Sequence, residues 1–407
     1  MALGMDSETY AKLRADIRAD LREEIMAEVR QQLIPMAIAR SLAMSLSGKI
    51  ALVTGASRGI GRGIALQLGE AGATVYITGR EPKHALDAER GDLPTLEATA
   101  NEITKRGGKG IAIYVDHSDM GQVEKLFARL KTETDGQLDI LVNNAYSAVQ
   151  ALCDVNGKTF WEMDASIWDE VNNVGLRNHY YCCVYAARMM VPRKRGLIVN
   201  ISSVGGLTYL FNVAYGVGKC AVDRMAADMA NELRTENVAI VSLWPGAVRT
   251  ELFKKVVDSG KYDNSSDPQV RKMRKFLEEG ESTEFAGKAV VTLAKDTNIM
   301  KKSGRVLIAA DLGLDYKFTD IDGRQPPSLR SAKALLDIGG YSKIGDYLPN
   351  WLRIPGWLMT ALTRRQPPSL RSAKALLDIG GYSKIGDYLP NWLRIPGWLM
   401  TALTSRL

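Results

Sequence analysis

Hydrophobic and polar positions follow two different periods between residues 49 and 310. Short runs of β-branched and aliphatic residues alternate with longer segments in which apolar residues recur every three or four positions, the spacing of an amphipathic helix. The short runs predict seven strands, at residues 50–54, 74–78, 110–115, 140–143, 196–201, 238–243 and 305–309. Because strands that alternate with helices form parallel sheets, this pattern predicts an α/β fold with a doubly wound, seven-stranded parallel sheet.

A separate helical pattern occupies residues 1–45. Residues 6–33 are dense in charge, and six apolar residues recur there at helical spacing: Tyr10, Leu13, Ile17, Leu21, Ile25 and Val29. Such a stripe favours docking on the chain's own domain or on a second copy, and less often contact with a membrane. We expect a helical N-terminal extension outside the active site.

The C-terminal tail, residues 324–407, contains a duplication, because residues 324–363 and 365–404 are identical. Complete identity indicates a recent event, and at most one copy can fill any single docking site. Each copy holds the stretch YLPNWLRIPGWLMTALT, which is too short to span a bilayer but suits a lipid interface. Two interpretations stay open: peripheral membrane contact, or a helical extension that covers the core or a dimer seam of the central domain, residues 46–323.

Composition only slightly narrows the possible partners, metal sites and cellular compartments of the protein. The formal charge of +7 would suit nucleotide phosphates, anionic lipids or nucleic acid, but the sequence shows no interleaved basic and aromatic pattern, so no nucleic-acid partner is expected. Four cysteines without ligand spacing predict no metal site, a reduced compartment and packing roles. The N-terminus lacks the features of a secretory signal, and no apolar run is long enough to cross a bilayer.

A glycine-rich turn follows the first predicted strand in the segment KIALVTGASRGIGRG. Gly55, Gly59 and Gly61 would permit a tight turn and a close approach of the backbone to a pyrophosphate, which the N-terminus of the next helix attracts. The same turn places Ser57 and Ile60 against the ligand. This strand, turn and helix predict a Rossmann-type site for a dinucleotide.

Two arginines favour NADP(H) over NAD(H). Where NAD enzymes usually offer an acid after the second strand, this chain has Thr78, Gly79 and Arg80, and Arg58 lies within the glycine turn. Guanidinium groups pair well with phosphate oxygens, so Arg58 and Arg80 are predicted to bind the 2'-phosphate of NADP(H).

Further cofactor contacts are expected where other strands end, because open parallel sheets bind ligands at the carboxyl ends of their strands. Asp116 is predicted to meet the adenine edge. The segment NNA is predicted to brace the central region of the cofactor through Asn143 and Asn144, with Ala145 as a further contact. After the sixth strand, the nicotinamide is expected against Pro245, Gly246, Val248 and Thr250. The charged segment that follows, residues 251–284, suggests a mobile lid, or else a plain pair of surface helices.

Tyr215 and Lys219 are the predicted centre of catalysis. They lie four residues apart on one face of a predicted helix, and a nearby ammonium group lowers the pKa of a phenol towards the useful range. Ser203, at the end of the strand segment GLIVNISS, is predicted to hold a substrate carbonyl opposite the tyrosine. In the reductive direction a hydride would reach the carbonyl carbon while Tyr215 protonates the oxygen.

The strings TGASRGIG, NNA, SS, YGVGK and PG together resemble the short-chain dehydrogenase/reductase family over residues 46–310. The resemblance implies an NADPH-dependent reductase that acts on ketones and aldehydes of steroid or xenobiotic type. It further implies a homo-oligomer and association with the endoplasmic reticulum membrane, although a cytoplasmic location stays open.

Two positions depart from the pattern of that family. Tyr146 stands where most members have glycine, so it should narrow the space beside the nicotinamide and contact the substrate. Gly175 stands where most members carry an asparagine that supports the lysine through water, and Asn172 or Asn173 would be substitutes only with a shift of register. These departures keep a second hypothesis open, a scaffold or membrane-surface protein that binds NADP(H) but turns over little.

Overall fold

A computed structural model describes residues 45–82, 93–155, 157–251, 280–333, 348 and 352–355. Its centre is a sheet of seven strands in the order β3-β2-β1-β4-β5-β6-β7, with every pairing parallel. The strands are β1 (Ile50–Val53), β2 (Thr74–Gly79), β3 (Lys109–Tyr114), β4 (Ile140–Asn143), β5 (Gly196–Ile201), β6 (Val238–Trp244) and β7 (Val306–Ile308). The predicted fold class is therefore confirmed.

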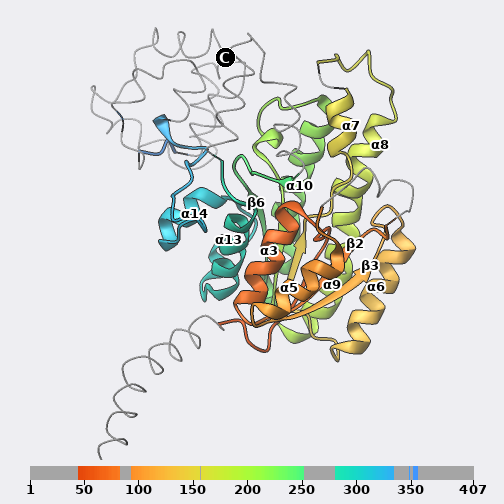
Figure 1. Ribbon diagram of the computed structural model, residues 1–407, viewed down its shortest axis with the longest axis vertical. Helices are drawn as coiled ribbons and strands as arrows, with labels where there is room; N and C mark the ends of the chain where they lie inside the picture. The colour runs from red at the N-terminus through yellow and green to blue at the C-terminus, as the bar shows by residue number, and fades with distance from the viewer. Residues whose placement is uncertain are drawn as a thin grey trace, which may run out of the picture.

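Helices cover both faces of this sheet (Figure 1). One face packs against α3 (Gly59–Glu70), α5 (Leu96–Lys105) and α13 (Thr283–Lys295). The other face packs against α6 (Met120–Glu133), α9 (Asn178–Met190) and α10 (Val213–Leu233). Successive strand residues point to opposite faces, so Leu52 belongs to the second core cluster and Val53 to the first. Burial on both faces explains why these strands read as continuous apolar runs.

Shorter helices surround the carboxyl ends of the central strands. They are α7 (Val149–Asp154), α8 (Ile167–Asn172), the 3-10 turn η4 (Val204–Gly206) and α14 (Ala309–Tyr316). Between α8 and α9 the chain forms a π-helical turn, η2 (Asn173–Arg177), in which the backbone N–H of Asn178 donates to the carbonyl of Asn173, five residues earlier. Such turns widen a helix locally and often lie at functional sites.

The beginning of the first tail repeat packs on the domain. Backbone hydrogen bonds join Ala332 to Leu352 and Ile354 to Arg330. Arg330 and Arg353 both pair with Asp311 on α14, at 3.0 and 3.1 Å. This part of the first copy thus docks on the central domain, and most of the remaining tail, including the second copy, lies outside the described residues.

Other predictions also fall outside the described part of the chain. The helical extension predicted for residues 1–45 and most of the predicted lid fall on residues 1–44 and 252–279, which the structure does not describe. Within the described ranges no helix is long and apolar enough to span a membrane, and no cluster of potential metal ligands is present. Among the cysteines, Cys182 and Cys183 are buried as predicted, whereas Cys153 and Cys220 are exposed, so the packing role predicted for those two is wrong.

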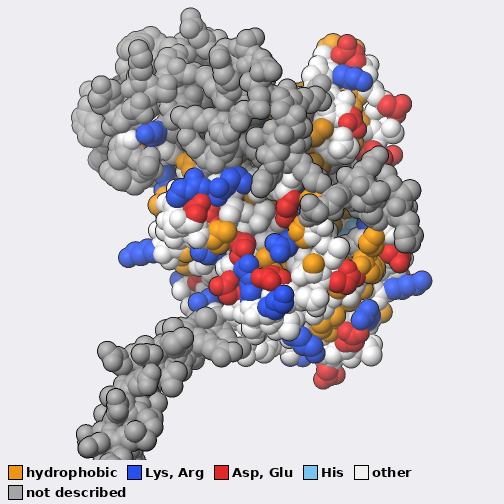
Figure 2. All heavy atoms as spheres, viewed as in Figure 1, with side chains coloured by type: hydrophobic (Ala, Val, Ile, Leu, Met, Phe, Trp, Pro, Cys, Tyr) orange, Lys and Arg blue, Asp and Glu red, His pale blue; other side chains and the backbone are white. Residues whose placement is uncertain are grey.

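The surface over α3, α5 and α13 carries basic and acidic side chains in alternation (Figure 2). One contact here joins Arg106 of α5 to Glu284 of α13 at 2.6 Å. The positive net charge is therefore not gathered into a single basic stripe on this face.

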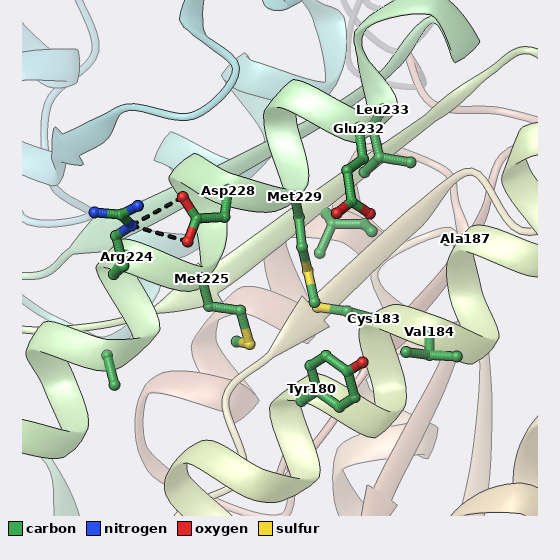
Figure 3. Close-up of a pocket in the computed structure, with 12 residues that line it drawn as sticks. Tyr180, Cys183, Val184, Ala187, Arg224, Met225, Asp228, Met229, Glu232 and Leu233 are labelled. Carbon is green, nitrogen blue, oxygen red and sulfur yellow. Dashed lines mark hydrogen bonds and ion pairs between the residues drawn. The ribbon is translucent and has the colours of Figure 1, made fainter.

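An open groove lies on the opposite side of the molecule, between α9 and α10 (Figure 3). Its volume is about 490 Å³. Tyr180 and Val184 line it from α9, and Met225 and Met229 from α10, while Arg224 and Asp228 form an ion pair at its edge. None of the predicted catalytic or cofactor residues lines this groove.

Candidate active site

The glycine turn between β1 and α3 has the geometry that a dinucleotide needs. Gly55 and Gly59 have φ values of +66° and +61°, a region that favours glycine. A Cβ atom on Gly61 would overlap the side-chain nitrogen of Asn144 and the carbonyl oxygen of Gly55. The backbone of the turn is therefore closely packed on the side that faces Asn144, and its other side faces the carboxyl edge of the sheet.

An anionic oxygen already lies at the N-terminus of α3. The carboxylate of Glu251 accepts a hydrogen bond of 2.8 Å from the backbone N–H of Gly59. The first turn of α3 contains no acidic residue of its own, so its unpaired N–H groups and dipole favour an external anion. This observation fits the phosphate of a dinucleotide, which would replace the carboxylate.

The segment after β4 braces the glycine turn through its backbone and through Asn144. Thr54 Oγ1 accepts hydrogen bonds from the N–H groups of Asn144 and Ala145, both at 3.0 Å. The Asn144 amide donates to the carbonyl oxygens of Thr54 and Gly55 at 2.9 and 3.0 Å. Asn143 lies elsewhere: its side chain is fully buried and donates to Asn200 Oδ1 at 2.9 Å, because β4 directs it into the core. The amide side chain that supports the turn is therefore that of Asn144, which corrects the role predicted for the Asn143 side chain.

The arginines and Asp116 lie at the ends of β2 and β3. Thr78 points inward, where its hydroxyl contacts the ring of the buried His117 at 2.7 Å, so the exposed residue after β2 is Arg80. Burial would raise the pKa of Asp116, but hydrogen bonds from Ser118 and the charge of Arg80 hold that pKa below its usual value. Arg58 is the residue before α3, and Ser57 accepts a hydrogen bond from Thr99 on α5.

Tyr215 is held by the beginning of α10. Asn212 caps this helix, since its side-chain oxygen accepts a hydrogen bond of 2.9 Å from the N–H of Tyr215. Tyr215 is 9 % exposed, so its ring is buried and only a small part reaches solvent. The rings of Phe211 and Tyr146 contact it edge to face, with centroids 5.0 and 6.2 Å away. These contacts fix the position of the phenol beside Ser203.

Lys219 follows one helical turn later on the same face. Its Nζ donates to the carbonyl of Ile201 at 3.1 Å, and it lies 5.1 Å from the ring centroid of Tyr146. Burial lowers the pKa of Lys219 to about 8, and the negative charge of Asp223 opposes this shift. Asp223 accepts hydrogen bonds from the indole of Trp244 at 3.1 and 3.2 Å. The surroundings of Lys219 therefore include the carboxylate of Asp223 and the rings of Tyr146 and Tyr215.

The pKa of Tyr215 differs from the sequence-based expectation. Burial raises this pKa above its ordinary value, and a hydrogen bond with the Ser203 side chain opposes the rise. The charge of Lys219 was expected to lower the pKa of the phenol, whereas in the structure burial has the larger effect because it disfavours the phenolate.

The turn after β6 closes the site from the other side. Val248 pairs with Glu281 in an isolated parallel bridge, and the N–H of Glu281 donates to Ala247 at 2.8 Å. This pairing brings Thr250 close to the glycine turn, with its methyl group 3.8 Å from the position of a Cβ on Gly59. The chain bends at Ala247, directly after Pro245 and Gly246.

Comparison with known proteins assigns the family. The sequence profile of the short chain dehydrogenases matches residues 49–260. A mouse protein named dehydrogenase/reductase SDR family member 1 is 50 % identical over 310 residues, which cover 76 % of this chain and 95 % of that protein. The chain belongs to the short-chain dehydrogenase family.

More distant relatives agree with this assignment. A chloroplastic protein of Arabidopsis thaliana, named NADPH-dependent aldehyde reductase 2, is 31 % identical over 206 residues, covering 50 % of this chain and 73 % of its own length. The crystal structure of a short-chain type dehydrogenase/reductase from Mycobacterium marinum has a TM-score of 0.51 and 27 % identity, covering 65 % of this chain and 95 % of that one. The chain is thus an oxidoreductase of this family with a Rossmann-type fold.

Several residues of the site were not singled out from the sequence. Asp223 lies one turn beyond Lys219, and this spacing on one helix face was a usable signal. Glu281, which is 1 % exposed, packs against Gly246, and burial raises its pKa to about 8. The contact of Glu251 with Gly59 joins residues 192 positions apart, so no local pattern indicates it.

Proposed function

We propose that this short-chain dehydrogenase reduces ketone or aldehyde carbonyls with NADPH. The observation that carries the proposal is the buried Tyr215, which lies beside Ser203 and on the same helix face as Lys219. The names of the mouse and Arabidopsis relatives support reductase chemistry. Arg58 and Arg80 at the ribose end support the 2'-phosphate form of the cofactor.

The positions of the site residues indicate what each would do when NADPH and a carbonyl substrate are bound. Gly55, Gly59 and Gly61 would hold the pyrophosphate, and the segments at Ala145 and at residues 245–250 would enclose the nicotinamide. When bound, NADPH supplies the hydride. Ser203 would then donate a hydrogen bond to the substrate carbonyl oxygen, and Tyr215 would transfer its proton to that oxygen as the alcohol forms.

Lys219 would act in two ways in this reaction. Its ammonium would hydrogen-bond the ribose of the cofactor, which places the nicotinamide, and its charge would favour the phenolate that Tyr215 becomes after giving up its proton. A Tyr215 pKa raised by burial keeps the hydroxyl protonated before reaction, as a proton donor requires.

The direct test is NADPH oxidation with a panel of steroid ketones, quinones and aromatic aldehydes. We expect turnover in the intact protein and a loss of at least a thousandfold in kcat for Tyr215→Phe, with NADPH binding by fluorescence changed less than about threefold. Tyr181→Phe on α9 is the matched control. Tight NADPH binding without any turnover in the intact protein would instead favour the scaffold hypothesis.

Three further features belong to the same proposal. A steroid or xenobiotic carbonyl and association with the endoplasmic reticulum membrane are proposed from the family resemblance, and flotation with lipid vesicles tests the latter. The groove between α9 and α10 is proposed to contact a second copy of the chain, because the exposed Tyr180 and the half-buried Met225 and Met229 form an apolar strip (Figure 3). Sedimentation equilibrium tests this, and a monomer at micromolar concentration would contradict it.

A further inference from the structure

The ring of Tyr146 lies directly against the backbone of Gly175. A Cβ atom on Gly175 would come within 2.8 and 2.9 Å of Tyr146 Cδ2 and Cε2, closer than real Cβ atoms approach a ring. Gly175 lies in the π-helical turn η2, where the helix is widened. The space that a side chain at position 175 would take is therefore filled by Tyr146, so a larger residue at position 175 requires a smaller one at position 146.

The neighbouring asparagines do not take the place of the missing side chain. Asn172 donates to the carbonyl of Ala214 at 3.3 Å and packs against Gly218 of α10. Asn173 accepts a hydrogen bond from Arg177 at 3.2 Å on the exposed side of the helix. Each amide is thus engaged with a partner other than Lys219.

The face of the Tyr146 ring is turned to Lys219. The lysine Nζ is 5.1 Å from the Tyr146 centroid and 5.9 Å from that of Tyr215. An ammonium group carries three N–H donors, and the backbone oxygen of Ile201 accepts one of them at 3.1 Å. Lys219 is 8 % exposed, and a buried cation is stabilised by the negative face of an aromatic ring within about 6 Å.

We infer that Tyr146, paired with Gly175, is the positioning residue that holds the Lys219 ammonium in the active site. The aromatic ring replaces the hydrogen-bonded support that an asparagine at position 175 would give through water. This inference rests on the proposed function of Lys219. It adds that the Tyr146 ring keeps the buried amine of Lys219 protonated and in position. The ring does this work rather than the phenol hydroxyl, since that oxygen is buried without a hydrogen-bond partner among the described residues.

Changes at position 146 separate support of the lysine from simple packing. Tyr146→Leu should lower kcat roughly tenfold to thirtyfold, because the cation loses the ring. Loss of the ring also lowers the pKa of Lys219, so the decline of kcat on the alkaline side should begin at a lower pH than in the intact protein. Tyr146→Phe keeps the ring, and it should recover most of the kcat and of the pH profile that Tyr146→Leu loses.

Tyr181→Leu is the matched control, because the Tyr181 ring also contacts a cation, Arg177 at 5.3 Å, but away from the proposed site. It should leave the pH profile of kcat unchanged. The inference is overturned if Tyr146→Leu retains the kcat and pH profile of the intact protein, or if Tyr146→Phe behaves like Tyr146→Leu.

Exchange of both residues supplies an independent test. Gly175→Asn alone should lower kcat and the unfolding midpoint, because the new side chain and the Tyr146 ring need the same space. Combining it with Tyr146→Gly should give a kcat several times higher than Tyr146→Gly alone, since an asparagine can then support Lys219 through water. A double variant no more active than Tyr146→Gly, with the same unfolding midpoint as the intact protein, would argue against the exchange.

A measurement without turnover distinguishes this inference from the proposed function. Competitive acetylation of lysines, read by mass spectrometry against pH, reports the protonation of Lys219 directly. A lower pKa of Lys219 in Tyr146→Leu than in the intact protein would support the inference even if no carbonyl is reduced. Equal pKa values in the two proteins would overturn it, whatever the outcome of the reductase assay.

Discussion

The two ends of the site are built in different ways, although both lie at the carboxyl edge of one sheet. After β1 and β2 the chain forms the proposed cofactor end from backbone: glycines with positive φ, helix N–H groups and carbonyl oxygens held by Asn144. After β4 and β5 it forms the proposed catalytic end from packed side chains around Tyr215 and Lys219. A backbone turn of this kind restricts the residues that fit it, whereas packed side chains permit paired changes, as we infer for Tyr146 with Gly175.

Among the changes that test this comparison, the largest effect is expected from one methyl group added at the cofactor end. Gly61→Ala should weaken NADPH binding at least a hundredfold and lower the free energy of unfolding by about 3 kcal/mol, because the new Cβ overlaps the Gly55 carbonyl and the Asn144 amide. Fluorescence titration and thermal unfolding measure the two effects. Gly121→Ala on α6, where a Cβ meets only a flexible carboxylate at 3.2 Å, is the control. Equal effects of both changes would show that the turn tolerates a side chain.

A glycine-to-alanine change at the catalytic end should lower the rate of the chemical step and leave NADPH binding nearly unchanged. A Cβ on Gly205 would lie 2.6 Å from Tyr215 Cε1, so the phenol must move. Gly205→Ala is expected to lower kcat roughly tenfold to a hundredfold, because small displacements of a catalytic group are costly. The dissociation constant for NADPH should stay within about twofold. A loss of NADPH binding comparable to that of Gly61→Ala would abolish the distinction between the two ends.

The smallest effect concerns the choice of cofactor. Arg80→Ala should lower the ratio of kcat/KM for NADPH over NADH roughly tenfold, the worth of one lost charge-assisted hydrogen bond to phosphate. Steady-state kinetics with both cofactors measure this ratio. Arg129→Ala on α6, which removes an exposed arginine paired with Glu133, should leave it unchanged. An unaltered ratio in Arg80→Ala would remove this residue from the 2'-phosphate site.

The contrast between the two ends also explains which parts of the fold and of the site could be predicted from the sequence. The strands were predicted to within a residue because most of them, β1, β2, β4, β5 and β6, are buried on both faces, and the glycine turn because its backbone admits few other residues. Asn143 and Asn144 were predicted to act together, but successive strand residues alternate between core and cleft, so only the Asn144 side chain reaches the glycine turn. The pKa of Tyr215 could not be predicted, since it depends on burial by Phe211 and Tyr146.

The contact between Glu251 and Gly59 has a consequence for how any dinucleotide enters. The carboxylate is part of the chain, so it competes for the helix terminus as an intramolecular ligand with a high effective concentration. Cofactor association is then an exchange of one anion for another, and its affinity measures a difference between two bound states. Removing this competitor would tighten cofactor binding without adding any contact to the cofactor itself.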